Sequence, residues 1–287
     1  MVHRVGRLGP SLILTFVLTF VGLSHLPGLS SAADPVGKLS VGGQFGFSSY
    51  GMSQVNAGIS RGSAIVEQNA TTTWTTPDHL HHGLDFMGDA NYDVTKTIRI
   101  GLNYGRTSGT TKVDYVEVMS VEAKTTTLTP RVYYRLPWRP FENMTFRAFG
   151  GLVLLQNART TVTHEDTNKS SPRLESMTID GSGTGLTGGL TSEYTISDRF
   201  TLGFEAGYRK ATVKFGSGSY SISKIQTPGL DDNGDGVPNN REPRIDSFLW
   251  GFMKTDRYIR GQEPQVRSLD TDFSGVDVRV ALHLYIF

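Results

Sequence analysis

The sequence predicts an all-β fold: an eight-stranded antiparallel transmembrane β-barrel with long external loops. Apolar and polar residues alternate along eight segments. Because successive side chains of a strand point to opposite faces, each segment predicts a strand with one apolar and one polar face. The connections between the segments alternate strictly between long and short. The 33 glycines and the many threonines, tyrosines and phenylalanines favour strands and turns over helices.

Residues 1–33 are predicted to form a secretory signal peptide. Two arginines stand near its start, residues 12–23 form an apolar core, and residues 31–33 are the small residues that signal cleavage requires. The apolar core is short for a membrane span, so cleavage is favoured over an uncleaved anchor. The barrel then occupies residues 34–287.

The segment 273–287 shows the alternation most clearly. Every second residue from Val276 to Ile286 is apolar, and the residues between them include Asp277 and Arg279. The segment is long enough to cross a bilayer at a tilt, which takes about 9–11 residues. In a membrane both of its edges must be paired, and only a closed barrel achieves this. The edge strand of a soluble sandwich is the alternative, but the same pattern repeats along the chain.

The seven earlier strands follow in order at about residues 39–47, 80–94, 98–104, 121–136, 146–154, 186–196 and 200–208. Short turns are predicted at residues 95–96, at 137–143, where two prolines exclude a central strand, and at 197–199. The long connections are predicted as external loops at about residues 48–79, 106–120, 159–177 and 216–271. Aromatic residues cluster beside the short turns, as in the girdle at a membrane interface.

The even strand number, the short turns at one end and the long loops at the other resemble the small bacterial outer-membrane barrels of the OmpA/OmpX type. The resemblance covers the mature chain and implies an outer-membrane location in contact with the lipid bilayer. The ending Tyr285-Ile286-Phe287 is similar to the C-terminal signature that the barrel-assembly machinery reads, so Phe287 implies that machinery as a partner. The apolar alternation departs from the family pattern, because it ends at Ile286 rather than at Phe287.

The polar faces of the strands place charges of both signs in the predicted lumen. The acids are Asp85, Asp89, Asp93, Glu193, Glu205 and Asp277, and the bases are Arg99, Arg131, Arg135, Arg147, Arg209 and Arg279. Eight strands leave an interior that side chains can fill, and buried charges there must pair. We expect a plug of ion pairs; the alternative is a narrow ion path through pairs that rearrange.

The segment 231–242 matches the twelve-position calcium loop of EF-hands. The predicted ligands are Asp231, Asn233, Asp235, Val237, Asn239 and Glu242. Gly236 provides the sharp turn at position six, whereas Pro238 lacks the N–H that pairs two such loops, so the site would stand alone. The run resembles the solitary calcium repeats of thrombospondin type 3, and Ca²⁺ is the expected ion. The alternative is a polar turn that binds nothing. Apolar residues at helical spacing follow at 245–253.

The sequence favours a non-enzymatic barrel with a structural or surface-interaction role, such as adhesion, in which calcium orders an external loop. It leaves the surface ligand unnamed. A small pore or transport channel is the alternative, and an enzyme that modifies lipid or peptide is the third. His164 and His283 have no neighbouring nucleophile at a recognisable spacing, and His79 and His81 lack a third metal ligand. With 28 basic and 27 acidic residues and no basic patch, nucleic-acid binding is not expected.

Overall fold

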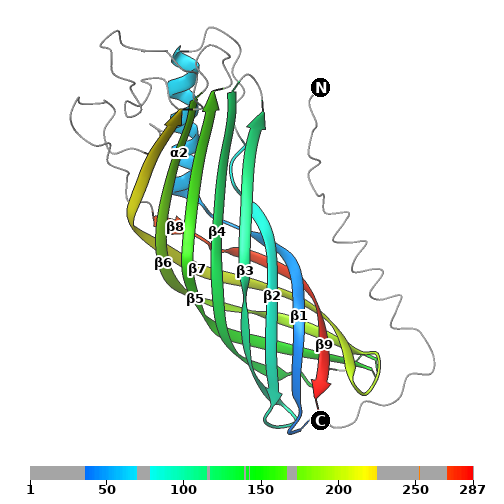
Figure 1. Ribbon diagram of the computed structural model, residues 1–287. Coiled ribbons are helices and arrows are strands. Elements are labelled where there is room, and N and C mark those ends of the chain that lie inside the picture. Colours follow the sequence, from blue (N-terminus) through cyan, green and yellow to red (C-terminus); the bar gives the residue numbers. More distant parts are fainter. Residues whose placement is uncertain are drawn as a thin grey trace.

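A computed structural model describes residues 36–69, 78–114, 117–138, 140–141, 143–166, 173–224, 252 and 270–286. Eight of its strands close into an antiparallel barrel, which confirms the predicted fold class (Figure 1). These strands are β1 (Leu39–Ser49), β2 (His82–Asp93), β3 (Ile98–Asp114), β4 (Glu117–Arg135), β5 (Met144–Asp166), β6 (Arg173–Thr195), β7 (Phe200–Lys224) and β9 (Gly275–Ile286). The last strand, β9, closes the ring between β1 and β7, while the short β8 (Asp270–Asp272) pairs with β7.

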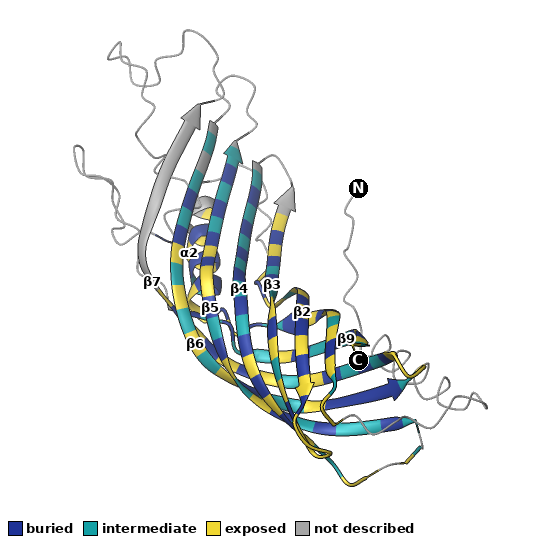
Figure 2. Cartoon of the chain, turned by 60° about the horizontal axis from the view of Figure 1, so that its bottom comes forward, coloured by how far each residue is buried: buried dark blue, intermediate teal, exposed yellow. Residues whose placement is uncertain are grey.

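Burial follows the predicted two-residue period. On β9, Leu282 is 52% exposed and Val276 is 53% exposed, whereas Asp277 and Arg279 are each 2% exposed. Figure 2 shows the same alternation of buried and exposed residues along the other strands. The apolar face therefore points outward and the polar face points into the lumen, as the alternation predicts.

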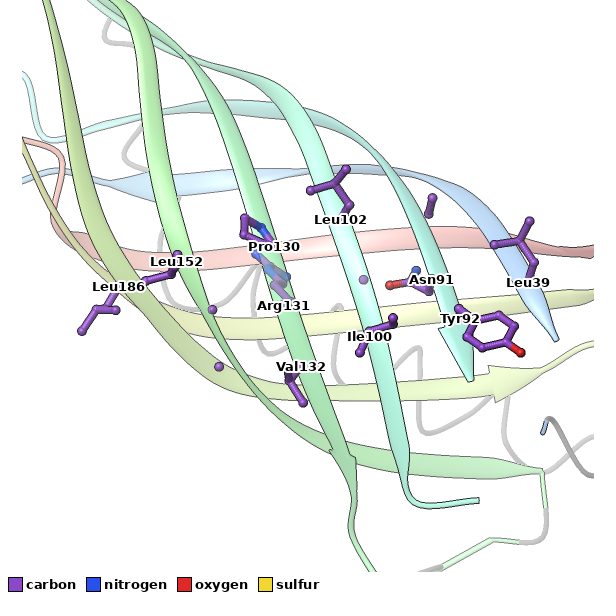
Figure 3. A pocket seen from close by; sticks show the side chains of 14 residues that line it. Leu39, Asn91, Tyr92, Ile100, Leu102, Pro130, Arg131, Val132, Leu152 and Leu186 are labelled. Carbon is purple, nitrogen blue, oxygen red and sulfur yellow. The ribbon is translucent and has the colours of Figure 1, made fainter. Parts of the chain in front are cut away.

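The outward face is apolar and grooved. One groove of about 760 Å³ crosses the outside of the barrel and is lined by apolar side chains from neighbouring strands, among them Leu102, Val132, Leu152 and Leu186 (Figure 3). Leu152 pairs with Leu186 across β5 and β6, and Val132 pairs with Ile100 across β3 and β4. Exposed apolar surface of this extent is what a strand presents to lipid.

Five strands run further than the sequence predicts. The segments 106–120 and 159–177 were expected to be loops but are mostly strand. In the first, β3 and β4 stay paired as far as Asp114 and Val118; in the second, β5 and β6 stay paired as far as Asp166 and Arg173. In Figure 1, β3 to β7 continue as a curved sheet above the ends of β1, β2 and β9, and we call this extended part of the five strands the wall. In the wall the polarity is reversed: Val121 and Ala123 are buried on the inner face, while Glu122 and Lys124 point outward. The expected lipid-facing pattern is therefore absent there.

A helix, α2 (Ser53–Asn69), occupies part of the segment 48–79 that was predicted to be a loop. Val55 and Ile59 are fully buried on one side of α2, and Ser53 and Ser60 are exposed on the other. The Asn56 amide holds the helix to the chain before β2: its nitrogen donates to the Leu80 carbonyl at 3.2 Å, and its oxygen accepts from the Leu80 N–H at 2.8 Å. Among the described residues, no helix has the length and apolar character needed to cross a membrane.

The buried side of α2 and the inner face of the wall form one apolar core. Its members are Tyr50, Met52, Val55, Ile59, Leu80, Met119, Val121, Ala123, Val153, Leu155, Ala158, Val162, Met177, Ile179, Ala211, Val213, Phe252 and Phe273. Tyr50 packs edge-on against Phe273, with ring centroids 5.7 Å apart, and burial raises the pKa of its hydroxyl. The register of β5 gains a residue between Leu155 and Ala158, where Asn157 has a φ of 49°. Such a bulge bends a strand, and here it lies within the wall.

Candidate functional site

The barrel interior is the candidate functional site, because it holds the charges that the sequence places on the polar faces. All six predicted acids are buried, and so are five of the six predicted arginines. The sixth, Arg135, is half-buried and donates to the Thr145 hydroxyl at 3.3 Å. The alternation along the strands therefore predicts the lumen-facing charges correctly.

The first group of charges surrounds Arg279 on the closing strand. We call it the Arg279 cluster, and it consists of Asp85, Arg131, Glu205, Arg209, Asp277 and Arg279. Arg279 contacts Asp85 at 2.8 Å, Glu205 at 2.7 Å and Asp277 at 3.1 Å. Arg131 contacts the second oxygen of Glu205 at 2.6 Å. Three arginines thus neutralise three carboxylates, as burial in a region of low dielectric requires.

Neutral groups complete the Arg279 cluster. Thr107 donates to Asp85 at 2.6 Å, and the Ser48 hydroxyl bridges Asp85 and Asp277. Arg209 donates from Nε to the Phe273 carbonyl at 3.0 Å. Sequence reasoning did not identify these partners: an inward-facing hydroxyl is visible in the alternation, but nothing in the sequence shows which acid it bonds.

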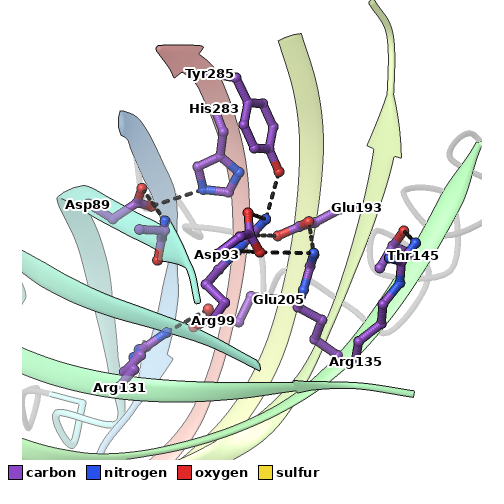
Figure 4. A network of polar contacts seen from close by, with 12 residues as sticks. Asp89, Asp93, Arg99, Arg131, Arg135, Thr145, Glu193, Glu205, His283 and Tyr285 are labelled. Carbon is purple, nitrogen blue, oxygen red and sulfur yellow. Dashed lines mark hydrogen bonds and ion pairs between the residues drawn. The ribbon is translucent and has the colours of Figure 1, made fainter. Parts of the chain in front are cut away.

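The second group lies nearer the short turns, and we call it the Arg99 cluster; it consists of Asp93, Arg99, Arg147, Glu193 and Tyr285 (Figure 4). Arg99 grips Asp93 with two nitrogens, at 2.9 and 3.0 Å, and also contacts Glu193. Its Nη2 donates to the Tyr285 hydroxyl at 2.6 Å. Arg147 binds the other oxygen of Glu193 and lies 3.6 Å from Asp93. A bidentate arginine–carboxylate contact of this kind fixes geometry as well as charge.

Asp89 organises a smaller polar group in the same lumen. His283 Nε2 lies 3.1 Å from one Asp89 oxygen, the Gln44 amide donates to the same oxygen, and Asn91 donates to the other at 3.0 Å. His283 therefore belongs to the lumen network. Asn103 is fully buried nearby on the lumen face, and neither of its amide atoms has a hydrogen-bond partner within the part of the chain that the structure describes.

The histidines at the start of β2 form a small exposed group. His79 and His81 have ring centroids 5.7 Å apart, and His79 Nε2 lies 3.0 Å from the Ser60 hydroxyl of α2. Within the described ranges, no group of three or more His, Asp or Glu side chains is arranged to hold a metal.

Several predicted features lie outside the described residues. They are the signal peptide at 1–33, the calcium loop at 231–242 and the C-terminal Phe287. Of the predicted helix at 245–253 only Phe252 is described; it is fully buried, and its ring lies where a side chain on Gly58 of α2 would stand. Phe252 therefore belongs to the apolar core, and the helix stays a prediction.

Solved structures with a similar arrangement include three outer-membrane proteins. The outer-membrane protein OprG of Pseudomonas aeruginosa is 13% identical, with a TM-score of 0.40, and the match covers 88% of this chain and 98% of OprG. A major outer-membrane protein of Thermus thermophilus is 12% identical, with a TM-score of 0.39 and coverage of 87% and 98%. Ail, the attachment invasion locus protein of Yersinia pestis, is 10% identical, with a TM-score of 0.32 and coverage of 88% and 99%. No curated protein sequence matches significantly.

The family comparison covers most of the chain. Residues 16–236 match the model of the outer membrane protein beta-barrel domain. This range includes seven of the eight barrel strands, and the eighth closes the same sheet. The chain therefore belongs to the family of outer-membrane β-barrel proteins, and its place is the outer membrane.

Proposed function

We propose that the protein is a non-enzymatic barrel, closed to solute flow, that serves surface structure or surface interaction such as adhesion. One observation carries this proposal: the interior is filled at successive levels. The Arg99 and Arg279 clusters occupy the lumen, and the apolar core under α2 fills the space inside the wall. An eight-stranded barrel has room for side chains or a small ligand but not for both ion clusters and a water-filled channel.

The wall supports a role at the surface. Short turns face the periplasm in this class of barrel, so the end that carries the wall and α2 faces outside. The outward side of the wall is polar above Thr126, with exposed residues such as Lys112 and Arg159. A stiff sheet that projects beyond the bilayer offers a partner a large preformed surface.

Conductance in planar bilayers tests the closed interior. The refolded protein should give no steady channels, because opening a path means separating buried ion pairs. Arg279→Ala in the same assay serves as the comparison: removal of the central cation should produce current if ion pairs close the lumen. Steady channels in the unmodified protein would establish the pore instead.

A narrow channel is the second candidate function, because one layer of the lumen contains polar groups that lack hydrogen-bond partners among the described residues. Around Asn103 the polar groups are less completely paired than in either ion cluster. An ion path would have to pass this layer and both clusters. An enzyme is less well supported, since the Asp89–His283 pair lies inside the lumen, where His283 is 5% exposed and out of reach of a lipid or peptide substrate.

The calcium loop is part of the proposal through its sequence alone. Asp231, Asp235 and Glu242 supply three carboxylates, and a solitary exposed site of this kind should bind with a dissociation constant of about 10⁻⁴–10⁻³ M. Calcium should protect the segment 225–269 from protease, whereas Asp231→Ala should abolish that protection. Equal cleavage with calcium and with a chelator would mean that the loop is only a polar turn.

A further inference from the structure

Two polar contacts reach across strand β1 at the seam where the barrel closes. The strand β1 lies between β9 and β2, so these two outer strands are about 10 Å apart. Gly46 of β1 stands directly opposite Arg279 of β9 on one side and Asp85 of β2 on the other. Arg279 reaches over the glycine and contacts Asp85 at 2.8 Å. This contact therefore joins the closing strand to β2 past the strand that separates them.

The second contact repeats this arrangement four residues nearer the short turns. Gly42 stands opposite His283 of β9 and Asp89 of β2, and His283 Nε2 lies 3.1 Å from one Asp89 oxygen (Figure 4). A Cβ atom at Gly42 would overlap the His283 ring and lie 2.9 Å from the other Asp89 oxygen, and one at Gly46 would lie 2.6 Å from Arg279 Cγ. Both glycines therefore leave the space through which a basic side chain of β9 reaches an acid of β2.

The two contacts differ in the base that they use. Arginine stays protonated throughout, whereas an unperturbed imidazole loses its proton at about pH 6.5. Among the described residues, five of the six lumen carboxylates contact an arginine, and Asp89 contacts His283 instead. The other two partners of Asp89, the amides of Gln44 and Asn91, are neutral donors. Within the described lumen, compensation of the Asp89 charge therefore falls to a protonated His283.

The other charged groups near His283 are already balanced. They are Glu193 of β6 and Arg99 of β3. Both belong to the Arg99 cluster, whose two arginines neutralise its two carboxylates. In the neighbouring strands, His283 stands opposite a glycine of β1 and Thr201 of β7, neither of which carries a charge. A proton on His283 thus serves Asp89 and no other acid.

We propose that His283 and Asp89 form a proton-dependent fastening of the barrel seam. While His283 carries a proton, the two residues join β9 to β2 as an ion pair beside the permanent pair of Arg279 and Asp85. When the proton leaves, Asp89 becomes a buried anion held only by neutral donors, and a buried charge without a counterion is strongly destabilising. The contribution of the fastening to stability is therefore present in mildly acidic surroundings and is lost as rising pH deprotonates His283 in the folded barrel.

Urea unfolding in lipid vesicles at about pH 6 and about pH 9 tests the fastening. The unmodified protein should be less stable at the higher pH, and Asp89→Asn and His283→Gln should each lose most of this difference. In a double-mutant cycle of these two changes, the coupling should be about tenfold in the unfolding equilibrium constant at the lower pH and less than about twofold at the higher. Equal coupling at both pH values would overturn the proton dependence, and no coupling at the lower pH would overturn the contact itself.

The charge of His283 can also be measured in the unmodified protein. Nuclear magnetic resonance of isotope-labelled histidine, with the His283 signal assigned by its absence in His283→Gln, reports whether each ring nitrogen carries a proton. Both nitrogens should be protonated at about pH 7.5, because the imidazolium is the form that compensates Asp89. A neutral His283 ring at that pH would overturn the proposal, whatever the variants show.

Matched variants separate the seam contact from general effects of substitution. Gly42→Ala places a methyl group where the His283 ring lies, so it should remove the stability difference between the two pH values. Gly43→Ala adds the same group to the next residue, where no atom lies within 4 Å of the Cβ position, and should keep the difference. His81→Gln removes an exposed histidine and should keep it as well. Faster migration of unheated samples on gels checks that each variant is folded. Retention of the full difference in Gly42→Ala, or its loss in either control, would overturn the assignment to this pair.

Discussion

At the scale of single residues, the lumen depends on charges that cannot reach water. Arg279 is 2% exposed and contacts three carboxylates that are themselves buried. A buried pair contributes little compared with an apolar core, but removal of one partner leaves the others uncompensated. The loss of stability caused by a substitution therefore depends on how many buried charges it leaves without a partner.

Arg279→Ala should lower the free energy of unfolding by about 3–5 kcal/mol, because Asp85, Glu205 and Asp277 would lose their common cation. Urea unfolding in lipid vesicles measures this. Arg159→Ala is the control: its pair with Asp180, at 2.6 Å, is exposed on the outer face of the wall, so the midpoint should hardly move. Similar losses in both variants would mean that the lumen is not dry.

The sequence was sufficient to predict which residues face the lumen, but not which of them form hydrogen bonds or ion pairs with one another. The alternation placed Asp85 and Arg279 on polar faces, since side-chain direction depends only on parity along a strand. That Ser48 bridges two acids depends on the stagger between β1, β2 and β9, which no local pattern encodes.

At the scale of elements, the wall and α2 show why the lipid-facing alternation predicts only the part of each strand that lies within the bilayer. Within the bilayer the apolar face points outward, and above it the same strands bury Val121 and Val162 on the inside. The period of two continues, but its polarity inverts, so the segments 106–120 and 159–177 look like polar loops. The helix α2 carries only a narrow apolar side in a Ser-, Asn- and Gly-rich sequence, and its core partners come from the wall.

Ile59→Ala should loosen α2 without opening the barrel. Ile59 is fully buried, and truncation of such a residue removes about 2–5 kcal/mol of packing. Amide hydrogen exchange in residues 53–69 should therefore speed up, while unheated protein still migrates faster than boiled protein. Glu67→Ala, at an exposed position of the same helix, should leave exchange unchanged. Loss of the faster-migrating form in Ile59→Ala would show that the barrel depends on α2.

At the scale of the whole molecule, closure is the property that the sequence predicts best. A strand in lipid has no water to satisfy its edge, so eight alternating segments leave a closed ring as the only solution. The observed ring meets this requirement through β9, which pairs with β1 from Leu39–Ile286 onward and with β7 from Phe200–Leu284 onward. The wall is under no such constraint, because its upper edges lie beyond the apolar band.

This difference predicts opposite outcomes for proline in two strands. Val280→Pro places proline in the middle of β9, opposite Phe45 on one side and Phe204 on the other, where a lost ladder hydrogen bond cannot be replaced by water. It should prevent closure, so that unheated and boiled samples migrate alike. Thr161→Pro disrupts β5 in the wall, between Glu122 and Thr178, where water can satisfy the freed groups. It should keep the faster-migrating form and change only protease sensitivity near residue 161. Loss of that form in both variants would mean that wall and barrel fold as one unit, and its retention in both would mean that β9 does not close the ring.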